Sequence, residues 1–354
     1  MTEQPKVIIR CLVYNHEPYL RDCLDGFVMQ KTSFPFKAVV HDDCSTDGSA
    51  AIIREYAEKY PHIIEPIYET ENQYSKRDGS LGRVMDAATL GRSPYIAYCE
   101  GDDYWIDPFK LQKQVDYMDT HPECSMTCTN AEVNMNGKYL QQEDFEHMQW
   151  GMLPSESGEL SLENIINYGG GYIYTCSILV RENILKQIQI LKKNFIVGDY
   201  PLQITAALFG QVYYFRAKTA VYNFAHPGSW NEHYASVKVD KYEKLVPIKI
   251  ADMLGVLDSF SNYNHTALFS RKRARIVVGC IKDYPYLGHE IKRKQRDLLL
   301  YKRARKYEKI ENKDFIQYIK WIIRRICFFP YYPYSIVLKG KFFQSIARCV
   351  LRKK

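Results

Sequence analysis

The chain has 354 residues, of which 46% are hydrophobic and 25% charged, so it can bury a sizeable core. Its ten cysteines show no paired metal-ligand spacing, and no apolar leader precedes the first apolar run. These features favour free thiols in a reducing cytosol over a secreted, disulfide-rich or zinc-binding protein. The net charge of +7 conceals an asymmetry, because residues 271–354 carry 24 Lys and Arg against 6 Asp and Glu, whereas residues 1–270 carry 24 against 35.

The first 130 residues alternate apolar runs with amphipathic stretches. Strands are predicted at 7–13, 38–40, 63–68 and 95–99. Helices are predicted over 15–30, 50–60 and 83–90, and from Asp107-Pro108, which fits a helix cap and first position. This alternation predicts an α/β fold with a parallel sheet and right-handed crossovers.

Three polar turns follow predicted strands: VYNHE, HDDCSTDG and CEGDDYW. Ligands of parallel sheets bind beyond the carboxyl ends of the strands. We therefore expect the three turns to meet in one crevice. After residue 130 the pattern weakens to a short helix (SLENIINY), a glycine-rich turn (GGGYIY), a helix after VGDYP and strands at 212–215 and 219–224.

The turn CEGDDYWIDP places Glu100, Asp102 and Asp103 within four residues. In one interpretation these acids are solvated while Asp107 caps a helix. In the other they hold Mg²⁺ or Mn²⁺, which prefer carboxylate and phosphate oxygens and which would bridge to a diphosphate. Packing, rather than ligand stacking, is the expected role of the neighbouring Trp105.

In the turn HDDCSTDG, Thr46 or Asp47 fits a helix cap, which leaves Asp42 and Asp43 unexplained. A carboxylate held at a strand end can accept the N3–H of uracil or thymine. The chain has no GxGxxG after its first strand and no GxxxxGK[ST], so dinucleotide and P-loop sites lack support.

Two further residues have both a structural and a catalytic interpretation. Asp199, in VGDYPLQ, fits either a helix cap or a general base on the acceptor side of the crevice. His226, in AHPGSW, is one of nine histidines, and a lone histidine is usually structural.

Taken together, these motifs resemble the family 2 glycosyltransferases of the GT-A fold. The resemblance rests on three segments in the same order and spacing: VIIRCLVYNHEPYLRDCLDGFVMQ, FKAVVHDDCSTDGSAAIIREYAEKYP and SPYIAYCEGDDYWIDPFKLQKQVDYM, which holds the DXD-like motif. It is strong over 1–130, patchy over 131–235 and absent beyond. It implies a Rossmann-like, mostly parallel sheet flanked by helices. The charge and periodicity of the remaining residues predict a C-terminal α-helical basic extension after this sheet.

The resemblance also implies roles for individual residues. Asp199 is implied as the catalytic base, although Gly198 stands where the family usually has a second acid. Asp102 and Asp103 are implied as the metal-binding pair, for Mn²⁺ or Mg²⁺, with Glu100 in place of a more usual Asp. The residues implied to bind the nucleotide-sugar are Leu12, Tyr14, Asp42, Asp43, Arg83, Glu100, Asp102 and His226; Lys76 and Arg77 are alternatives to Arg83 near the diphosphate.

The implied reaction is transfer of a sugar, with inversion, from a nucleotide-diphosphate-sugar, expected to be a UDP-sugar, to an acceptor hydroxyl. A glycan or lipid-linked glycan of capsule, O-antigen or exopolysaccharide synthesis is the expected acceptor. Two alternatives stay open. One is a metal-dependent nucleotidyltransferase, and the other is a non-catalytic, membrane-bound scaffold with a relic sugar-nucleotide fold.

We expect a catalytic domain over 1–240, with a nucleotide-sugar half (1–130) and an acceptor half (131–240), and a helical basic extension over 241–354. Residues 315–327 form an amphipathic pattern too short to span a bilayer, so the extension is expected to bind an anionic membrane surface. Packing on the acidic body, an oligomer interface and a nucleic-acid patch are the alternatives, of which nucleic acid is the least favoured. The expected location is the cytoplasmic face of the cell membrane.

Overall fold

The computed structural model describes residues 4–141, 144, 153–189, 195, 197–227, 229 and 246–283. Contacts divide the chain into two units, Met1–Ala304 and Arg305–Lys354, and all described residues belong to the first. The amphipathic stretch predicted over 315–327 therefore lies outside the described residues. Among the described helices, none is long and apolar enough to cross a membrane.

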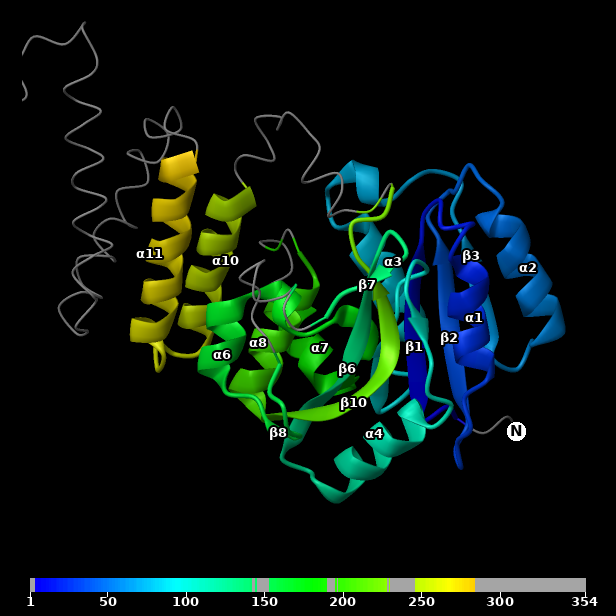
Figure 1. Cartoon of the computed structure of the whole chain (residues 1–354), viewed down its shortest axis with the longest axis horizontal. Coiled ribbons are helices and arrows are strands. Elements are labelled where there is room, and N and C mark those ends of the chain that lie inside the picture. The colour runs from blue at the N-terminus through cyan, green and yellow to red at the C-terminus, as the bar shows by residue number, and fades with distance from the viewer. Residues whose placement is uncertain are drawn as a thin grey trace, which may run out of the picture. The chain divides into compact units, whose positions relative to one another are not determined.

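A ten-stranded sheet in the order β3-β2-β1-β4-β9-β6-β10-β5 forms the centre of this unit, with β7 paired to β6 and β8 to β10 (Figure 1). The neighbours β3, β2, β1 and β4 are parallel, as predicted. Beyond β4 the sheet is mixed, because β9 runs antiparallel to both β4 and β6 while β10 runs parallel to β6. The strands are β1 Val7–Val13, β2 Phe36–Asp42, β3 Ile64–Tyr68, β4 Tyr95–Tyr98, β5 Tyr104–Trp105, β6 Cys124–Met135, β7 Lys138–Tyr139, β8 Gly158–Glu159, β9 Leu179–Arg181 and β10 Gln211–Asn223.

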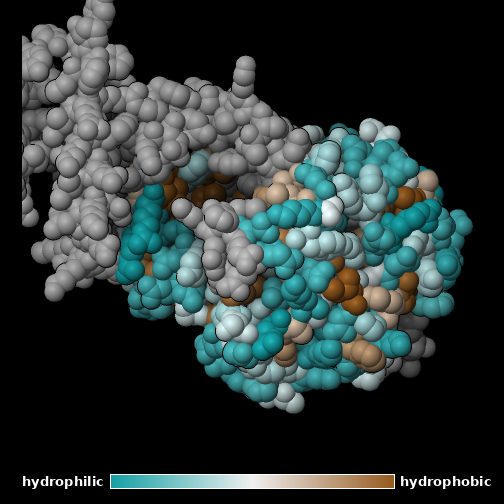
Figure 2. All heavy atoms as spheres, in the orientation of Figure 1, coloured by the Kyte–Doolittle hydropathy of each residue, from teal (hydrophilic) through white to brown (hydrophobic). Residues whose placement is uncertain are grey.

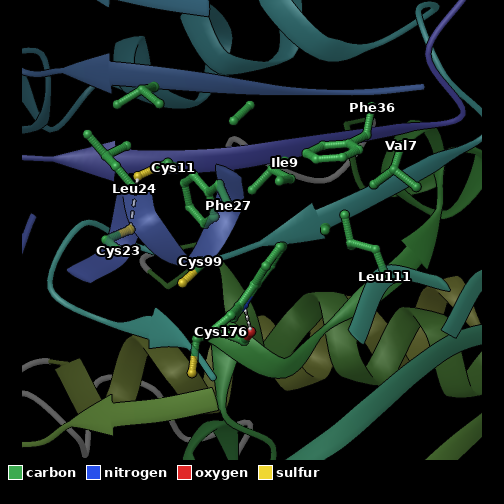
Figure 3. Packing of buried hydrophobic residues seen from close by; sticks show 14 of the residues in the cluster. Val7, Ile9, Cys11, Cys23, Leu24, Phe27, Phe36, Cys99, Leu111 and Cys176 are labelled. Carbon is green, nitrogen blue, oxygen red and sulfur yellow. Dashed lines mark hydrogen bonds between the residues drawn. The ribbon is translucent and has the colours of Figure 1, made fainter. Parts of the chain in front are cut away.

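Helices cover both faces of the sheet because the central strands are apolar on both sides. In β1, Val7, Ile9 and Cys11 enter one core cluster, with side chains of α1 (Leu20–Val28), α2 (Ser49–Lys59) and α4 (Lys110–Thr120) (Figure 3). Ile8 enters the other. The elements on that second side are α3 Ser80–Thr89, α6 Leu162–Tyr168, α7 Glu182–Gln189 and α8 Asp199–Phe209; short 3₁₀ turns are η1 Tyr74–Lys76, η2 Gly170–Tyr172 and η3 Thr175–Ser177.

Two C-terminal helices extend the second core cluster. Leu254 and Leu257 of α10 (Val246–Phe260) and Phe269 of α11 (Thr266–Asp283) are fully buried in it. The basic residues of α11 also contact the body, since Lys272 Nζ donates to the main-chain oxygen of Asn167 at 2.7 Å. The described beginning of the basic extension thus packs on the body of the fold, which was the alternative to a membrane surface.

Some predicted boundaries are wrong for local reasons. Helix α4 begins at Lys110 rather than at Pro108, because Asp107 starts a turn in which its carboxylate accepts the N–H of Phe109 and its carbonyl that of Lys110. The two strands predicted over 212–224 are the single strand β10, with register irregularities on both sides of Lys218. Helix α3 starts three residues early, at Ser80.

Candidate active site

The three polar turns meet at the carboxyl ends of β1, β2 and β4, as predicted. The Gly101 N–H donates to the Leu12 carbonyl at 2.9 Å, and the Asp43 N–H donates to the Val13 carbonyl at 2.9 Å. Because these bonds continue the strand pairing past the strand ends, the turns stay in fixed register.

Residues Ser45 to Ser49 form hydrogen bonds with the turn that follows β1. The Thr46 N–H donates to Asn15 Oδ1 at 2.7 Å, and the Glu17 N–H donates to Asp47 Oδ2 at 3.0 Å. Gly48, without a side-chain cap bond, occupies the N-cap of α2. Asp47 also caps α2, as predicted, because its Oδ1 accepts the N–H of Ser49, the first residue of that helix, at 3.0 Å. Thr46 instead holds the turn after β2 against the turn after β1.

The metal-binding interpretation concerns Glu100, Asp102 and Asp103, whose carboxylate oxygens lie within 4.8 Å of one another. Asp103 is 1% exposed, and its Oδ1 accepts the Asn223 N–H at 2.8 Å. Its Oδ2 is buried and accepts no hydrogen bond. Burial and the nearby Asp102 raise the pKa of Asp103. This oxygen is suited to a cation, because an uncompensated buried carboxylate is costly.

Asp102 lies between two histidines. Its Oδ2 is 2.9 Å from His226 Nε2 and 3.9 Å from His16 Nε2. Burial raises the pKa of Asp102, but the His226 hydrogen bond and the charges of both histidines outweigh it, so the pKa is lowered overall. The other ring nitrogen of His226, Nδ1, lies 3.0 Å from the Pro227 carbonyl. Two acceptors therefore face one imidazole, and a neutral ring satisfies only one of them. The neutral tautomer with its proton on Nε2 donates to Asp102, and a doubly protonated ring donates to both acceptors.

His16 is a site residue that the sequence analysis missed. Its ring fits because residue 101 is glycine: a Cβ there would lie 2.9 Å from His16 Nδ1 and 2.8 Å from a Val13 methyl group. Burial lowers the pKa of His16, which favours the neutral ring. The available signal was the position of His16 in the turn directly after the first strand.

Glu100 links the acidic cluster to Asp199. Burial, together with the charges of Asp102 and Asp199, raises the pKa of Glu100 to about 8. Asp199 contributes to that shift because its carboxyl group is close enough to act on Glu100 electrostatically, although the two residues are 99 positions apart in the sequence. At neutral pH Glu100 is therefore mainly protonated in the metal-free site.

Asp199 is the first residue of α8, and Gly198 occupies the N-cap, so the capping interpretation of Asp199 is wrong. Burial raises its pKa. The glycine run 169–171 packs against it: a Cβ on Gly170 would lie 3.0 Å from Asp199 Oδ2. Gln203 fixes this arrangement, since its Nε2 donates to the Gly170 carbonyl at 3.0 Å.

The residues predicted to line the nucleotide pocket occupy the ends of β1 and β2. Tyr14 is 46% exposed, and Leu12 is half-buried. Asp42 is buried, with Oδ1 accepting the Ser45 N–H at 3.2 Å. Asp43 is also buried, and both of its oxygens accept main-chain hydrogen bonds. Their contacts with a nucleotide stay predictions.

Arg83 lies on α3, and its side chain bonds residues at the start of that helix rather than the acidic cluster. Its guanidinium donates to the Asp78 carbonyl at 2.8 Å and to Ser80 Oγ at 2.7 Å. The predicted contact between Arg83 and a diphosphate is not tested by these bonds.

Polar and sulfur-containing side chains support the acidic turn from behind. Trp105 packs, as predicted, with its Nε1 donating to the Cys176 carbonyl at 2.7 Å. Lys110 is fully buried, 4.4 Å above the Trp105 ring, and donates to Gln114 Oε1 at 2.8 Å. Burial lowers the pKa of Lys110 to about 8. Cys11, Cys23, Cys44, Cys99, Cys124, Cys128 and Cys176 are free thiols. Figure 3 shows three of them near this turn, Cys11, Cys23 and Cys99.

Comparison with known proteins gives one family and several relatives. The family described as Glycosyl transferase family 2 matches residues 9–188. An uncharacterised protein of Mycobacterium tuberculosis is 33% identical over 221 residues, which is 62% of this chain and 59% of that protein. TuaG of Bacillus subtilis, named for teichuronic acid biosynthesis, is 30% identical over 32% of this chain and 42% of its own length. The crystal structure of S. aureus TarS with UDP-GlcNAc superposes with a TM-score of 0.48 and 18% identity, covering 78% of this chain and 81% of that one.

Proposed function

Because the chain belongs to the family 2 glycosyltransferases, we propose that it transfers a sugar from a nucleotide-diphosphate-sugar, a UDP-sugar, to an acceptor hydroxyl. The observation that supports this most strongly is the gathering of Asp102, Asp103 and His226 at the strand ends, with the carboxyl group of Asp199 nearby. Such a crevice offers cation-binding oxygens for a diphosphate and a separate carboxylate for the acceptor.

The residues of the acidic turn fit Mn²⁺ or Mg²⁺. Asp103 Oδ2 is buried without a hydrogen bond, and it belongs to a cluster of carboxylate oxygens from Glu100, Asp102 and Asp103, which are the ligands that such ions prefer. Asp102 and Asp103 would hold the ion, with His226 beside them. When bound, it would supply positive charge that offsets the charge of the donor diphosphate.

The proposed reaction is a single displacement. The Asp199 carboxylate takes the proton of the acceptor hydroxyl, and the acceptor oxygen forms a bond to the anomeric carbon of the donor sugar. The bond from that carbon to the diphosphate oxygen breaks on the opposite face, so the anomeric configuration inverts. The raised pKa of Asp199 makes it a stronger base than an exposed aspartate. His226 and Arg83 are proposed to stabilise the charge on the leaving diphosphate.

We propose a glycan or lipid-linked glycan of a surface polysaccharide as the acceptor, at the cytoplasmic face of the membrane. The name of TuaG supports the pathway class, and the positive charge of residues 271–354 supports contact with anionic lipid. Sedimentation with anionic vesicles tests the membrane part: the full chain should co-sediment, and residues 1–283 should not.

Turnover of a panel of UDP-, GDP- and dTDP-sugars with Mn²⁺ tests the proposed activity. One donor should support transfer or slow hydrolysis in the wild-type protein. Asp199→Asn should bind that donor with unchanged affinity and lose transfer by on the order of 10²- to 10⁴-fold. Full transfer by the variant would place the base elsewhere, and no turnover of any donor would refute the proposed function.

A further inference from the structure

The main chain of the acidic turn is held by side chains from other elements. Asn223, the last residue of β10, is 6% exposed, and its Nδ2 donates to the Asp102 carbonyl at 2.6 Å. Its main-chain N–H donates to Asp103 Oδ1 at 2.8 Å. The Glu100 carbonyl accepts a weaker donor, Cys23 Sγ, at 3.4 Å. Asn223 thus contacts both acids that are proposed to hold the ion.

A buried side-chain amide needs a partner for its oxygen as well. The described surface drawn in Figure 2 is largely hydrophilic, so polar side chains there can bond to water, whereas Asn223 is nearly shut off from solvent. Its Oδ1 accepts Asn134 Nδ2 at 2.8 Å, from the residue that faces it on β6. Asn134 Oδ1 in turn accepts the main-chain N–H of Gly137 at 2.9 Å. Hydrogen bonds therefore run in one line from Gly137 through two amides to the Asp102 carbonyl.

Main-chain groups at both ends fix the direction of this line. The Gly137 N–H can only donate, so Asn134 presents its oxygen to Gly137 and its NH₂ group to Asn223. Asn223 then presents its oxygen to Asn134 and its NH₂ group to the Asp102 carbonyl, which can only accept. Reversal of either amide sets two donors or two acceptors against each other, so each amide has one favourable orientation.

The line begins at a tight hairpin. Asn136 and Gly137, between β6 and β7, have φ values of 52° and 87°, which is typical of a two-residue hairpin turn. The Asn134 carbonyl also accepts the Phe224 N–H at 2.8 Å, which ties the end of β10 to β6. The hairpin therefore sets the position of the Gly137 N–H independently of the acidic turn.

We propose that Asn134 and Asn223 are positioning residues: their amides link the β6–β7 hairpin to the Asp102 main chain and hold the acidic turn in the arrangement that binds the divalent ion. The inference rests on the proposed function. Both side chains act through the main chain that carries the carboxylates. Substitution of a hydrogen-bond partner that lies behind a metal ligand typically lowers metal affinity by roughly 10- to 100-fold.

Asn134→Asp breaks the line while keeping an oxygen for the Gly137 N–H. It replaces the NH₂ group by a second oxygen, which faces Asn223 Oδ1 and favours reversal of the Asn223 amide. Asn136→Asp is the matched control, because it adds the same charge at an exposed position of the same hairpin and leaves the line intact. With UDP present, the dissociation constant of Mn²⁺, measured by electron paramagnetic resonance, should be on the order of tenfold higher in Asn134→Asp than in Asn136→Asp. Equal constants would overturn the proposal.

A double-mutant cycle tests whether the two amides act as one line. In the background of Asn223→Ala the line is already cut, so adding Asn134→Asp should change the dissociation constant of Mn²⁺ by less than about twofold. An effect of Asn134→Asp that is equally large in both backgrounds would overturn the proposal, because it indicates that the new charge acts directly on the ion.

Hydrogen exchange of the metal-free protein keeps this outcome distinct from failure of the proposed function. Exchange at residues 101–103 should be faster in Asn134→Asp than in Asn136→Asp. If the wild-type protein binds no Mn²⁺ with UDP, this comparison alone decides: faster exchange supports the positioning role, and equal exchange overturns it. If Asn134→Asp does not fold, Asn134→Ala is compared with Asn136→Gly by the same two measurements and the same criteria.

Discussion

Gly170 is the residue whose lack of a side chain matters most for Asp199. A Cβ at this position would lie 3.0 Å from Asp199 Oδ2 and 3.2 Å from the Tyr200 Cβ, so the carboxylate or the start of α8 has to shift. Because a small displacement of a catalytic group lowers the rate steeply, we expect Gly170→Ala to reduce kcat on the order of 10- to 100-fold with little change in donor KM.

Gly171→Ala is the control for this substitution. An added Cβ at Gly171 has no atom within 4 Å, so steady-state kinetics of this variant should match the wild type. Equal kcat values for the two alanine variants would show that the Asp199 carboxylate tolerates the contact.

Lys110 makes the free energy of unfolding depend on pH in the alkaline range. Its pKa falls from the usual 10.5 to about 8 in the folded protein, so between these values the unfolded chain binds the proton and the folded one does not. The contribution of Lys110 to the free energy of unfolding therefore rises as the pH increases from about 8 to 10.5. Below pH 8 this contribution is lower than above pH 10.5 by at most roughly 3 kcal/mol.

Lys110→Met removes this titration while keeping a long side chain. The difference in unfolding free energy, wild type minus variant, should increase between pH 8 and pH 10, as measured by urea denaturation at each pH. A difference that stays constant over this range would contradict the lowered pKa of the buried ammonium.

At the scale of elements, the helices α10 and α11 belong to the folded core. Leu254, Leu257 and Phe269 are fully buried against the same cluster as α6 and α8. Each such side chain contributes about 1.5–3 kcal/mol when buried. A chain of residues 1–283 should therefore unfold cooperatively, whereas residues 1–245 should expose the apolar side of α8 and aggregate.

Thermal unfolding followed by circular dichroism, with light scattering, compares these two chains. Cooperative, soluble behaviour of residues 1–245 would contradict the structural role of the two helices and would support the domain boundary predicted at residue 240. The thermal unfolding of residues 1–283 is compared with that of the full-length protein.

At the scale of the whole molecule, the parallel half of the sheet could be predicted from the sequence, because strand, polar turn and helix follow one another repeatedly along the chain. The position of the turns that hold Asp43 and Glu100, after strands on either side of β1, followed from this topology. The mixed half could not be predicted in the same way. Its antiparallel neighbours, such as β9 between β4 and β6, join segments far apart in the chain and leave no local signal.

The site shows the same division. Asp102 and Asp103 could be found because they follow a predicted strand, and Asp199 because the family resemblance implies an acid at that place. His16 and Gly170 could not, since their importance comes from contacts across the crevice: His16 with Asp102, and Gly170 with Asp199. The sequence did not reveal that Thr46 and Asp47 also bind the turn after β1, because those hydrogen bonds join segments about 30 residues apart.

The central claim is that Asp102 and Asp103 hold a divalent ion that binds a nucleoside diphosphate. Titration of free Mn²⁺ by electron paramagnetic resonance, with and without UDP, tests it most directly. The wild-type protein should bind one Mn²⁺ more tightly in the presence of UDP, and Asp102→Asn should lose this binding while its thermal unfolding stays cooperative. Equal Mn²⁺ binding by Asp102→Asn and the wild type, with UDP present, would contradict the account.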